Sequence, residues 1–365
     1  MRRPARRVNL NLRAAARKSR RAGAGRARYR APMRRLLVLF ALLAALPASP
    51  ALAWADKGHR LIATLAVEAL PDDVPGFLAR RGNLWTVGEV AREPDRSRGA
   101  GQPHDADLDP GHFIDVDDAG LVLGGPPLAD LPANRSEYEK AVVAAGRATR
   151  DAGYLPYTLM DGYQQLVKDF AYWRAARAGE RSAPRELRRR FRADRELRET
   201  LILVDLGHWG HFVGDGSNPL HVSVHYSGWG PFPNPEGYTN ARIHAPFEDV
   251  FVAEHVDRAA VKAAMKPYAA CGCAIKDGVQ RYLLASSARL EPLYRLWTDG
   301  GFSGADPRGE AFAVERLAAG ADQLRDWIVD AWRASGDMGV GYPAQTVKAI
   351  EAGQAIDPEA YFGRE

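Results

Sequence analysis

Apolar residues recur at helical spacing over most of the chain after residue 55. Apolar side chains three and four positions apart lie on one face of a helix, so each such stretch predicts an amphipathic helix. The predicted helices cover residues 56–70, 137–150, 157–178, 197–213, 243–263, 276–298 and 309–334. No long window alternates apolar and polar residues with a period of two, as a half-buried strand does. The sequence therefore predicts an all-α fold, a multi-helix bundle without a fixed-period repeat.

Two stretches lack this spacing and predict loops. Residues 83–135 contain six prolines among many Asp and Gly residues, which predicts a long loop region with short helical pieces. Residues 222–242 are rich in Gly, Pro and Asn and predict a second loop. The charge-dense stretch 180–199 is interpreted as a solvated helix face or a connection between helices.

The N-terminal segment has the layout of an exported leader. An apolar run from Leu36 to Leu46 follows two arginines and precedes small residues that end at Ala53. This pattern predicts a basic leader and signal peptide over residues 1–53, removed before Trp54. The run is shorter than the roughly 20 apolar residues of a membrane anchor, the alternative reading. We therefore expect a secreted or periplasmic protein with a domain over 54–340 and a polar tail over 341–365; Met1 and Met33 both remain possible starts.

Removal of the leader reverses the sign of the net charge. Residues 1–53 contain 14 Lys and Arg and no Asp or Glu, so 50 − 14 = 36 basic residues remain against 45 acidic ones. The mature chain therefore carries a formal charge of −9. Its bulk composition shows no basic excess of the kind that nucleic-acid-binding proteins often carry.

The two cysteines are interpreted as having no functional role. Cys271 and Cys273 are separated by a single residue, and a bridge between them would close a very small loop. We therefore expect no disulfide framework from them. Two thiolates are also an incomplete ligand set for a structural zinc site.

Histidine and acidic residues cluster at metal-ligand spacing in one part of the sequence. His211, Asp215 and His221 lie at positions i, i+4 and i+10, and His244 and Glu248 form a second i, i+4 pair. Residues four apart lie one turn apart on the same helix face, so an imidazole and a carboxylate can reach the same ion. Imidazole nitrogens and carboxylate oxygens without a thiolate are typical of catalytic zinc sites.

Further candidate ligands precede these pairs. Asp95 and His112 lie in the proline-rich region, and His59 lies on the first predicted helix. Cleavage before Trp54 would expose its α-amine five residues before His59, and an α-amine with its own carbonyl oxygen can chelate a metal. The remaining histidines are interpreted as core or surface groups: His104, His208, His225 and His255.

Together these residues resemble the zinc-dependent single-strand-specific nucleases of fungi and plants and the bacterial zinc phospholipase C enzymes that share their fold. The resemblance extends over residues 54–334, and its specific part is the set of ligand segments. It implies an all-α bundle with three zinc ions. One ion would bind Asp95, His112, His211 and Asp215; the second would bind the amine and carbonyl of Trp54, His59 and Asp215; the third would bind His221, His244 and Glu248.

The resemblance also implies roles around the metals. Asp95 would help to activate the attacking water, Arg98 would contact the phosphate, and Asp115 would orient the substrate. Phe113 would stack on a base. Trp229, in the second predicted loop, would contact either a base or a lipid headgroup.

Three functions remain open at this point. The first is a nuclease that cuts single-stranded DNA or RNA, the second a phospholipase C, and the third a metal-binding protein without turnover. Glu248 resembles the phospholipase branch, because the nucleases carry Asp there. The nucleases' Gly-Gly-Asn segment and disulfides are also missing. The other ligand spacings favour the nuclease. We also expect the protein to be a monomer without a stable protein partner.

Overall fold

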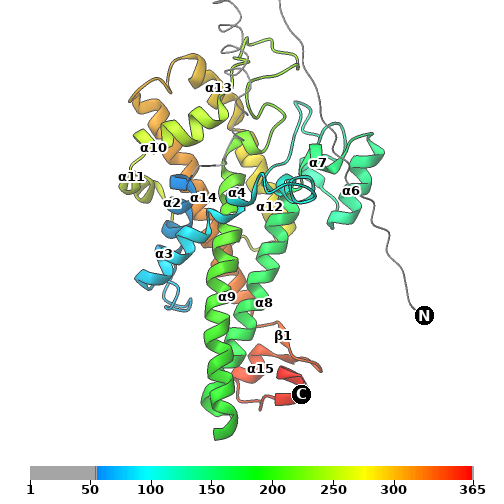
Figure 1. Cartoon of the computed structure of the whole chain (residues 1–365), viewed down its shortest axis with the longest axis vertical. Helices are drawn as coiled ribbons and strands as arrows, with labels where there is room; N and C mark the ends of the chain where they lie inside the picture. Colours follow the sequence, from blue (N-terminus) through cyan, green and yellow to red (C-terminus); the bar gives the residue numbers. More distant parts are fainter. Residues whose placement is uncertain (1–53, 55, 364–365) are drawn as a thin grey trace, which may run out of the picture. The chain divides into compact units, whose positions relative to one another are not determined.

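The structure, a computed structural model, describes Trp54 and residues 56–363. The predicted leader and signal peptide lie outside these residues. Apart from one antiparallel pair of two-residue strands, the named secondary-structure elements of the described part are all helical, so the all-α prediction is confirmed (Figure 1). No helix within the described residues is both long and apolar enough to cross a bilayer.

The first half of the domain consists of short helices around two long ones. The elements up to the long pair are α2 (Asp56–Glu68), α3 (Arg81–Val90), α4 (Glu93–Ser97), α5 (His104–Asp107), η1 (Asp109–His112), η2 (Leu128–Asp130), α6 (Arg135–Ala144) and α7 (Thr149–Ala152). The long pair is α8 (Leu155–Ser182) and α9 (Arg185–Ser217). Region 83–135 thus contains the short helices expected there, and the charged stretch after Pro184 continues as α9 without a break.

The second half adds another long helix and several short elements. They are η3 (Pro219–His221), the π-helical turn η4 (Pro246–Phe251), α10 (Val252–His255), α11 (Arg258–Ala264), α12 (Ile275–Ser287), α13 (Leu290–Thr298) and α14 (Pro307–Ala334). The chain then forms β1 (Gly339–Val340), β2 (Gln345–Thr346), α15 (Val347–Glu351) and α16 (Pro358–Phe362).

Three helices predicted as continuous are broken, and this is a correction. The prediction over 137–150 divides into α6 and α7 around Gly146, whose φ of 75° does not continue a right-handed helix. The prediction over 276–298 divides into α12 and α13. Pro292 has no amide hydrogen to donate to the carbonyl of Ala288, so it can lie only in the first turn of a new helix. The prediction over 243–263 divides at Val256 and Asp257, both in extended conformation between α10 and α11.

The core forms where α8, α9, α14 and α2 pack together. α8 and α9 lie side by side as an antiparallel hairpin joined at Ala183 and Pro184, and α14 contacts both of them and α2 (Figure 1). Trp209 of α9 stacks on Trp327 of α14, with 5.9 Å between ring centroids, and donates a hydrogen bond to the carbonyl of Leu159 on α8. These buried aromatic contacts fix the last turns of α9, from which two candidate ligands project.

The segment after residue 338, predicted as a polar tail from residue 341, packs against the side of α8. Val340, Val347 and Ile350 are buried against Ala171 and Ala175 in a small apolar cluster separate from the main core. Apolar residues at a few positions are enough to attach this otherwise polar segment. The boundary at residue 340 itself stays a prediction.

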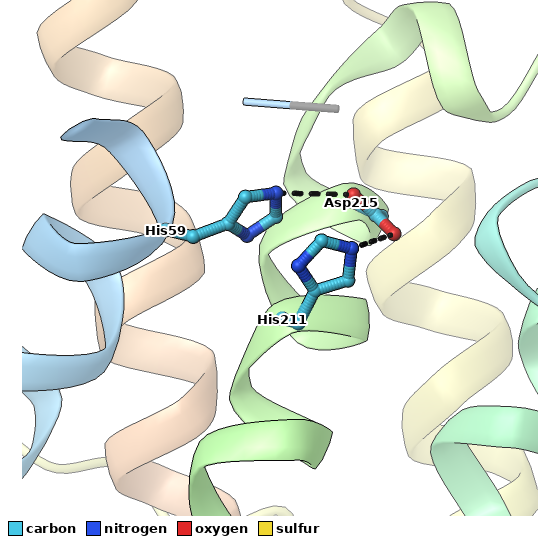
Figure 2. Close-up of side chains that lie close together, drawn as sticks. All are labelled: His59, His211 and Asp215. Atoms are coloured by element: carbon cyan, nitrogen blue, oxygen red, sulfur yellow. Dashed lines mark ion pairs between the residues drawn. The ribbon is translucent and has the colours of Figure 1, made fainter. Parts of the chain in front are cut away.

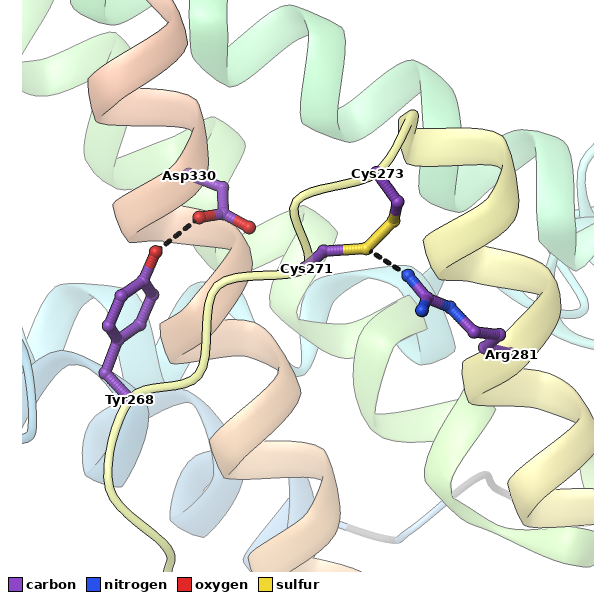
Figure 3. Close-up of a disulfide and its surroundings, with 5 residues drawn as sticks. All are labelled: Tyr268, Cys271, Cys273, Arg281 and Asp330. Atoms are coloured by element: carbon purple, nitrogen blue, oxygen red, sulfur yellow. Dashed lines mark hydrogen bonds between the residues drawn. A yellow bond between two sulfur atoms is a disulfide. The ribbon is translucent and has the colours of Figure 1, made fainter.

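The expectation for the cysteines is wrong, because Cys271 and Cys273 form a disulfide (Figure 3). Their Cα atoms lie 5.1 Å apart, within the ordinary range for a bridge. Gly272 between them has a φ of 58°, in the left-handed region that glycine adopts without a Cβ clash, and this turns the two side chains toward each other. The disulfide therefore forms because the residue between the two cysteines is glycine.

Candidate metal centre

The last turns of α9 carry the residue that connects most of the candidate ligands. His211 and Asp215 lie one turn apart, and His59 of α2 faces them (Figure 2). His59 Nε2 lies 3.5 Å from Asp215 Oδ1, while His211 Nε2 lies 3.4 Å from Asp215 Oδ2. All three side chains are fully buried. The two oxygens of Asp215 thus face different imidazoles, as expected of a carboxylate that bridges two ions.

The close approach of α2 and α9 at this point depends on a small residue. Gly214 precedes Asp215, and a Cβ atom there would lie 2.9 Å from Nδ1 of His59. Any larger residue would displace the imidazole or separate the two helices. The glycine therefore allows a ligand from α2 to reach the carboxylate on α9.

A second group of donor atoms extends the centre toward α4 and η1. Asp95, His112 and His211 each offer one atom within 4.8 Å of the others. His112 Nδ1 lies 3.0 Å from Asp215 Oδ2 and 3.0 Å from His211 Nε2. Because His112 and Asp95 come from the proline-rich region, the short helices there hold two candidate ligands against α9.

The third group lies where the chain turns back after α9. His221, at the end of η3, has its Nε2 atom 3.1 Å from Nε2 of His244 and 3.6 Å from Oε2 of Glu248. His244 Nε2 lies 2.9 Å from the same glutamate oxygen. Glu248 lies in the π-helical turn η4, a rare element that is frequent at functional sites. These three residues could hold one ion.

Two of the imidazoles are oriented by main-chain carbonyls. His211 Nδ1 donates to the carbonyl of Ala91 at 2.9 Å, and His221 Nδ1 donates to the carbonyl of His112 at 2.8 Å. A proton held on Nδ1 leaves the lone pair on Nε2, the atom that faces the other candidate ligands. This arrangement of a hydrogen-bonded nitrogen opposite a ligating one is typical of metal-binding histidine.

Burial shifts the pKa values of the ligands toward their neutral forms. It holds the pKa of His112 and of His211 well below the usual value, and lowers the pKa of His244 to about 3. It raises the pKa of Asp215 well above its usual value and that of Glu248 to about 7. Neutral imidazoles are ready to bind a cation, whereas the buried carboxylates need one to stay ionised.

The carboxylates also retain unused capacity for a ligand. Within the described residues, Asp215 Oδ1 and Glu248 Oε1 are buried and accept no hydrogen bond. Buried acceptors of this kind are rare in native structures unless water or an ion satisfies them. The donor set, its burial and these oxygens therefore fit zinc.

Trp54 is held beside the third group. Its side chain is fully buried, and its indole Nε1 donates to the carbonyl of Gly214 at 2.8 Å and to Oγ of Ser217 at 2.9 Å. Its main-chain nitrogen lies 3.1 Å from Oε2 of Glu248. The structure thus brings the nitrogen that cleavage would release to the candidate ligands.

A pocket of about 280 Å³ opens beside the candidate ligands. Its lining residues are Arg98, His112, Phe113, Asp115, Leu220, His221, Tyr226 and His244. Nη1 of Arg98 lies 3.7 Å from Oδ1 of Asp95, and the guanidinium of Arg98 places positive charge at the pocket. Burial raises the pKa of Asp115 to about 8. Three residues predicted to contact substrate therefore meet at one cavity with candidate metal ligands.

The structure does not bring Trp229 to this pocket. Its ring is only 5% exposed, stacks on His225 with centroids 3.8 Å apart, and packs edge-on against Tyr294. Its indole nitrogen donates to the carbonyl of Pro233. Trp229 therefore packs inside its loop and does not face the pocket, which corrects the prediction that it contacts substrate.

Two residues at the centre escaped prediction. Tyr226 lines the pocket with a ring that is 52% exposed, and no periodicity distinguishes it within its loop. Asn218 is fully buried, donates to Oε2 of Glu248 at 2.9 Å and accepts from the amide of Leu220. Asn218 could have been found from the Asn-Pro pair that precedes His221, because Asn commonly caps a turn that begins with proline.

No protein-family model matches the chain, and no curated protein sequence matches it. Among solved structures, the chain is similar to the alpha-toxin of Clostridium perfringens from avian strain SWCP, with 12% sequence identity and a TM-score of 0.32. The alignment covers 78% of this chain and 67% of the toxin chain. A likeness at this level carries nothing over to the site, so the function is inferred from the site's own residues.

Proposed function

We propose that the chain is a secreted or periplasmic zinc-dependent phosphodiesterase that hydrolyses single-stranded DNA or RNA. The observation that carries this proposal is the convergence of three groups of buried histidine and acidic donors beside a pocket that contains a guanidinium. In the proposal, these groups and the amine and carbonyl of Trp54 hold three zinc ions. When bound, zinc supplies Lewis-acid polarisation of the phosphodiester and activation of a water molecule.

The protein's own residues have separate parts in the proposal. Asp215, whose two oxygens face His59 and His112, would hold two of the ions. Asp95, 3.9 Å from Nδ1 of His112, would be a further ligand. Arg98 stands beside Asp95, where its planar guanidinium can pair with a phosphate oxygen. Such preformed positive charge stabilises a phosphodiester as negative charge develops during hydrolysis.

The pocket supports nucleic acid over lipid as the substrate. Phe113 offers a ring on which a base can stack, and Asp115 offers a carboxyl group within the same cavity. A flat heterocycle with polar edges matches a ring plus a carboxyl, whereas an acyl chain needs an extended apolar groove. Glu248, which resembles the phospholipase C branch, is the residue that favours the alternative.

A substrate panel tests the proposal directly. Purified protein supplied with zinc is incubated with single-stranded DNA, with RNA and with phosphatidylcholine, beside an Asp215→Asn variant as control. We expect cleavage of one or both nucleic acids by the wild type and none by the variant. Release of phosphocholine alone would replace the nuclease proposal with a phospholipase C. Bound zinc without cleavage of any substrate would leave a metal-binding protein.

A further inference from the structure

Positive charge gathers at the end of the α8–α9 hairpin that lies far from the candidate ligands. Residues 174–198 contain ten arginines and four acidic residues, although the chain after residue 53 is acidic overall. Arg195 precedes His211 by 16 residues on the same helix, which at 1.5 Å per residue is roughly 24 Å. The concentration of guanidinium groups there has no part in the candidate metal centre.

A cleft of about 630 Å³ collects these charges. Its lining residues are Pro75, Gly76, Phe77, Arg80, Trp173, Arg177, Glu180, Arg181, Arg192, Arg195 and Glu199. Five guanidinium groups thus face two carboxylates in one concave site. Trp173 and Phe77, with ring centroids 5.6 Å apart, form its apolar wall.

The carboxylates of the cleft are already used. Glu180 pairs with Arg192 at 2.6 Å and with Arg195 at 2.7 Å. Glu199 pairs with Arg195 at 2.6 Å and accepts a hydrogen bond from the indole of Trp173. Both acidic groups are therefore neutralised by the two arginines of α9.

Three arginines remain without such a partner. Within the described part of the chain, the structure shows no ion pair between a carboxylate and Arg80, Arg177 or Arg181. Arg177 lies over the ring of Trp173 at 5.1 Å. Burial, with the positive charges of Arg181 and Arg195, lowers the pKa of Arg177. Like charges that converge in this way are a ready site for an anion.

Helix α3 connects this cleft with the candidate metal centre. Arg80 lines the cleft directly before α3, and Ala91, directly after it, accepts the hydrogen bond from His211. Ten residues of helix span about 15 Å, the length of roughly five stacked nucleotides. Arg81 and Trp85 of α3 lie between Arg80 and Ala91 in the chain and are exposed, with the Trp85 ring 69% exposed.

We propose that the cleft around Arg80, Arg177 and Arg181 binds the phosphodiester backbone of a single-stranded nucleic acid whose scissile bond lies at the metal centre. This proposal rests on the proposed function and adds a second contact region to it. Guanidinium groups bind phosphates, and Trp85 offers a stacking face for a base between the two regions. Substrates long enough to reach both regions bind more tightly than short ones.

The shape of the cleft favours a nucleic-acid strand over an anionic membrane. A lipid surface is flat and contacts protruding side chains, whereas these arginines surround a concavity whose apolar wall includes the almost buried Trp173. A flexible phosphodiester chain can enter such a concavity. Binding to a membrane is the competing outcome of the experiment.

The test compares substrate lengths in two charge-matched variants. Arg177→Gln/Arg181→Gln removes two charges from the cleft, and Arg147→Gln/Arg150→Gln removes two exposed charges that do not line it. The KM for single-stranded DNA of about 30 nucleotides is expected to rise about tenfold in the cleft variant and less than about twofold in the control. The slope of log KM against log salt should fall by about 0.7 for each lost contact. Turnover of a dinucleotide, too short to reach the cleft, should stay equal in both variants.

The same measurements separate the failure of each proposal. Equal KM values for the long strand in both variants would overturn the cleft proposal while leaving the nuclease intact. If wild-type protein cleaves no nucleic acid, the nuclease proposal fails, and fluorescence anisotropy of a labelled strand decides on the cleft. Loss of strand binding in the cleft variant alone would support it. Tighter binding to phosphatidylserine vesicles than to the strand would overturn it.

Discussion

Ionisable groups are buried at the C-terminal end of helix α9, whereas at its N-terminal end they form ion pairs nearer the surface. At the C-terminal end, His211 and Asp215 are fully buried, and a carboxylate oxygen there accepts no hydrogen bond from any described residue. At the N-terminal end, Arg192 and Arg195 form short ion pairs with glutamates at the surface. A buried charge without a partner is costly, whereas a solvated ion pair contributes little to stability. A bound cation would therefore stabilise the ionised carboxylates at the first end, whereas the second end offers a place for an anion without depending on one.

The comparison predicts its largest effect for Asp215. Replacement of Asp215 by Asn removes the charge that faces His59, His112 and His211, and should lower turnover about 1000-fold or more. Initial rates on single-stranded DNA measure this loss. Asp249→Asn, an exposed carboxylate next to Glu248, is the matched control and should stay within about twofold of wild type. Equal activity of both variants would remove Asp215 from the centre.

The next prediction concerns Trp54 as the first residue that the proposed cleavage would leave. One extra residue before Trp54 converts its α-amine into an amide, which cannot ligate as an amine does, and should lower activity about 10- to 100-fold. A protein with one extra residue at the C-terminus serves as control. Activity equal to that of the control would show that the nitrogen beside Glu248 is not a ligand.

The sequence could predict this centre where ligands share one helix. His211 and Asp215, and likewise His244 and Glu248, stand four residues apart, so helical geometry alone brings each pair together. Asp95 and His112 were candidates only as polar residues of a proline-rich region, and their assignment to one ion came from the resemblance, because no spacing rule brings them together. The carbonyl of Ala91, which orients His211, could not be predicted, since that contact depends on how α3 packs against α9.

The fold, too, could be predicted from sequence only where a local pattern determines it. Periodicity located the long helices α8 and α14, whose buried faces repeat over many turns. It missed the breaks at Val256 and before Leu290, because local proline and backbone geometry end a helix without changing its apolar pattern. Trp229 looked like a binding residue, yet burial against His225 and Tyr294 decides its place.

Metal removal should destabilise the protein at its buried end. Without a cation, Asp215 and Glu248 stay buried among neutral imidazoles, so chelation with EDTA should lower the melting temperature by on the order of 10 °C. Thermal unfolding followed by circular dichroism measures this change, and added zinc should restore it. Chelation is not expected to affect the N-terminal end of α9, where the arginines lie. A melting temperature unaffected by EDTA would show that the fold does not depend on a bound ion.

The smallest effect is expected at Asp115, in the pocket between the ligands and solvent. Burial raises its pKa from 3.8 to about 8, so the folded protein holds this proton more tightly than the unfolded chain does. Its contribution to stability is complete below pH 3.8 and is lost as the pH rises through 8. Asp115→Asn should therefore stabilise metal-free protein at pH 8 by on the order of 1 kcal/mol and leave it unchanged near pH 4. Urea unfolding at both pH values measures the difference, and a larger gain at pH 4 would reverse the assignment.

If the buried histidine and acidic groups hold zinc, the purified protein must contain it, so its metal content is the decisive measurement. Purified protein with Trp54 as its first residue is dialysed without a chelator and analysed for zinc by elemental analysis. We predict about three zinc ions per chain in the wild type and fewer in Asp215→Asn. Wild-type protein that is folded yet contains no stoichiometric zinc would contradict the account.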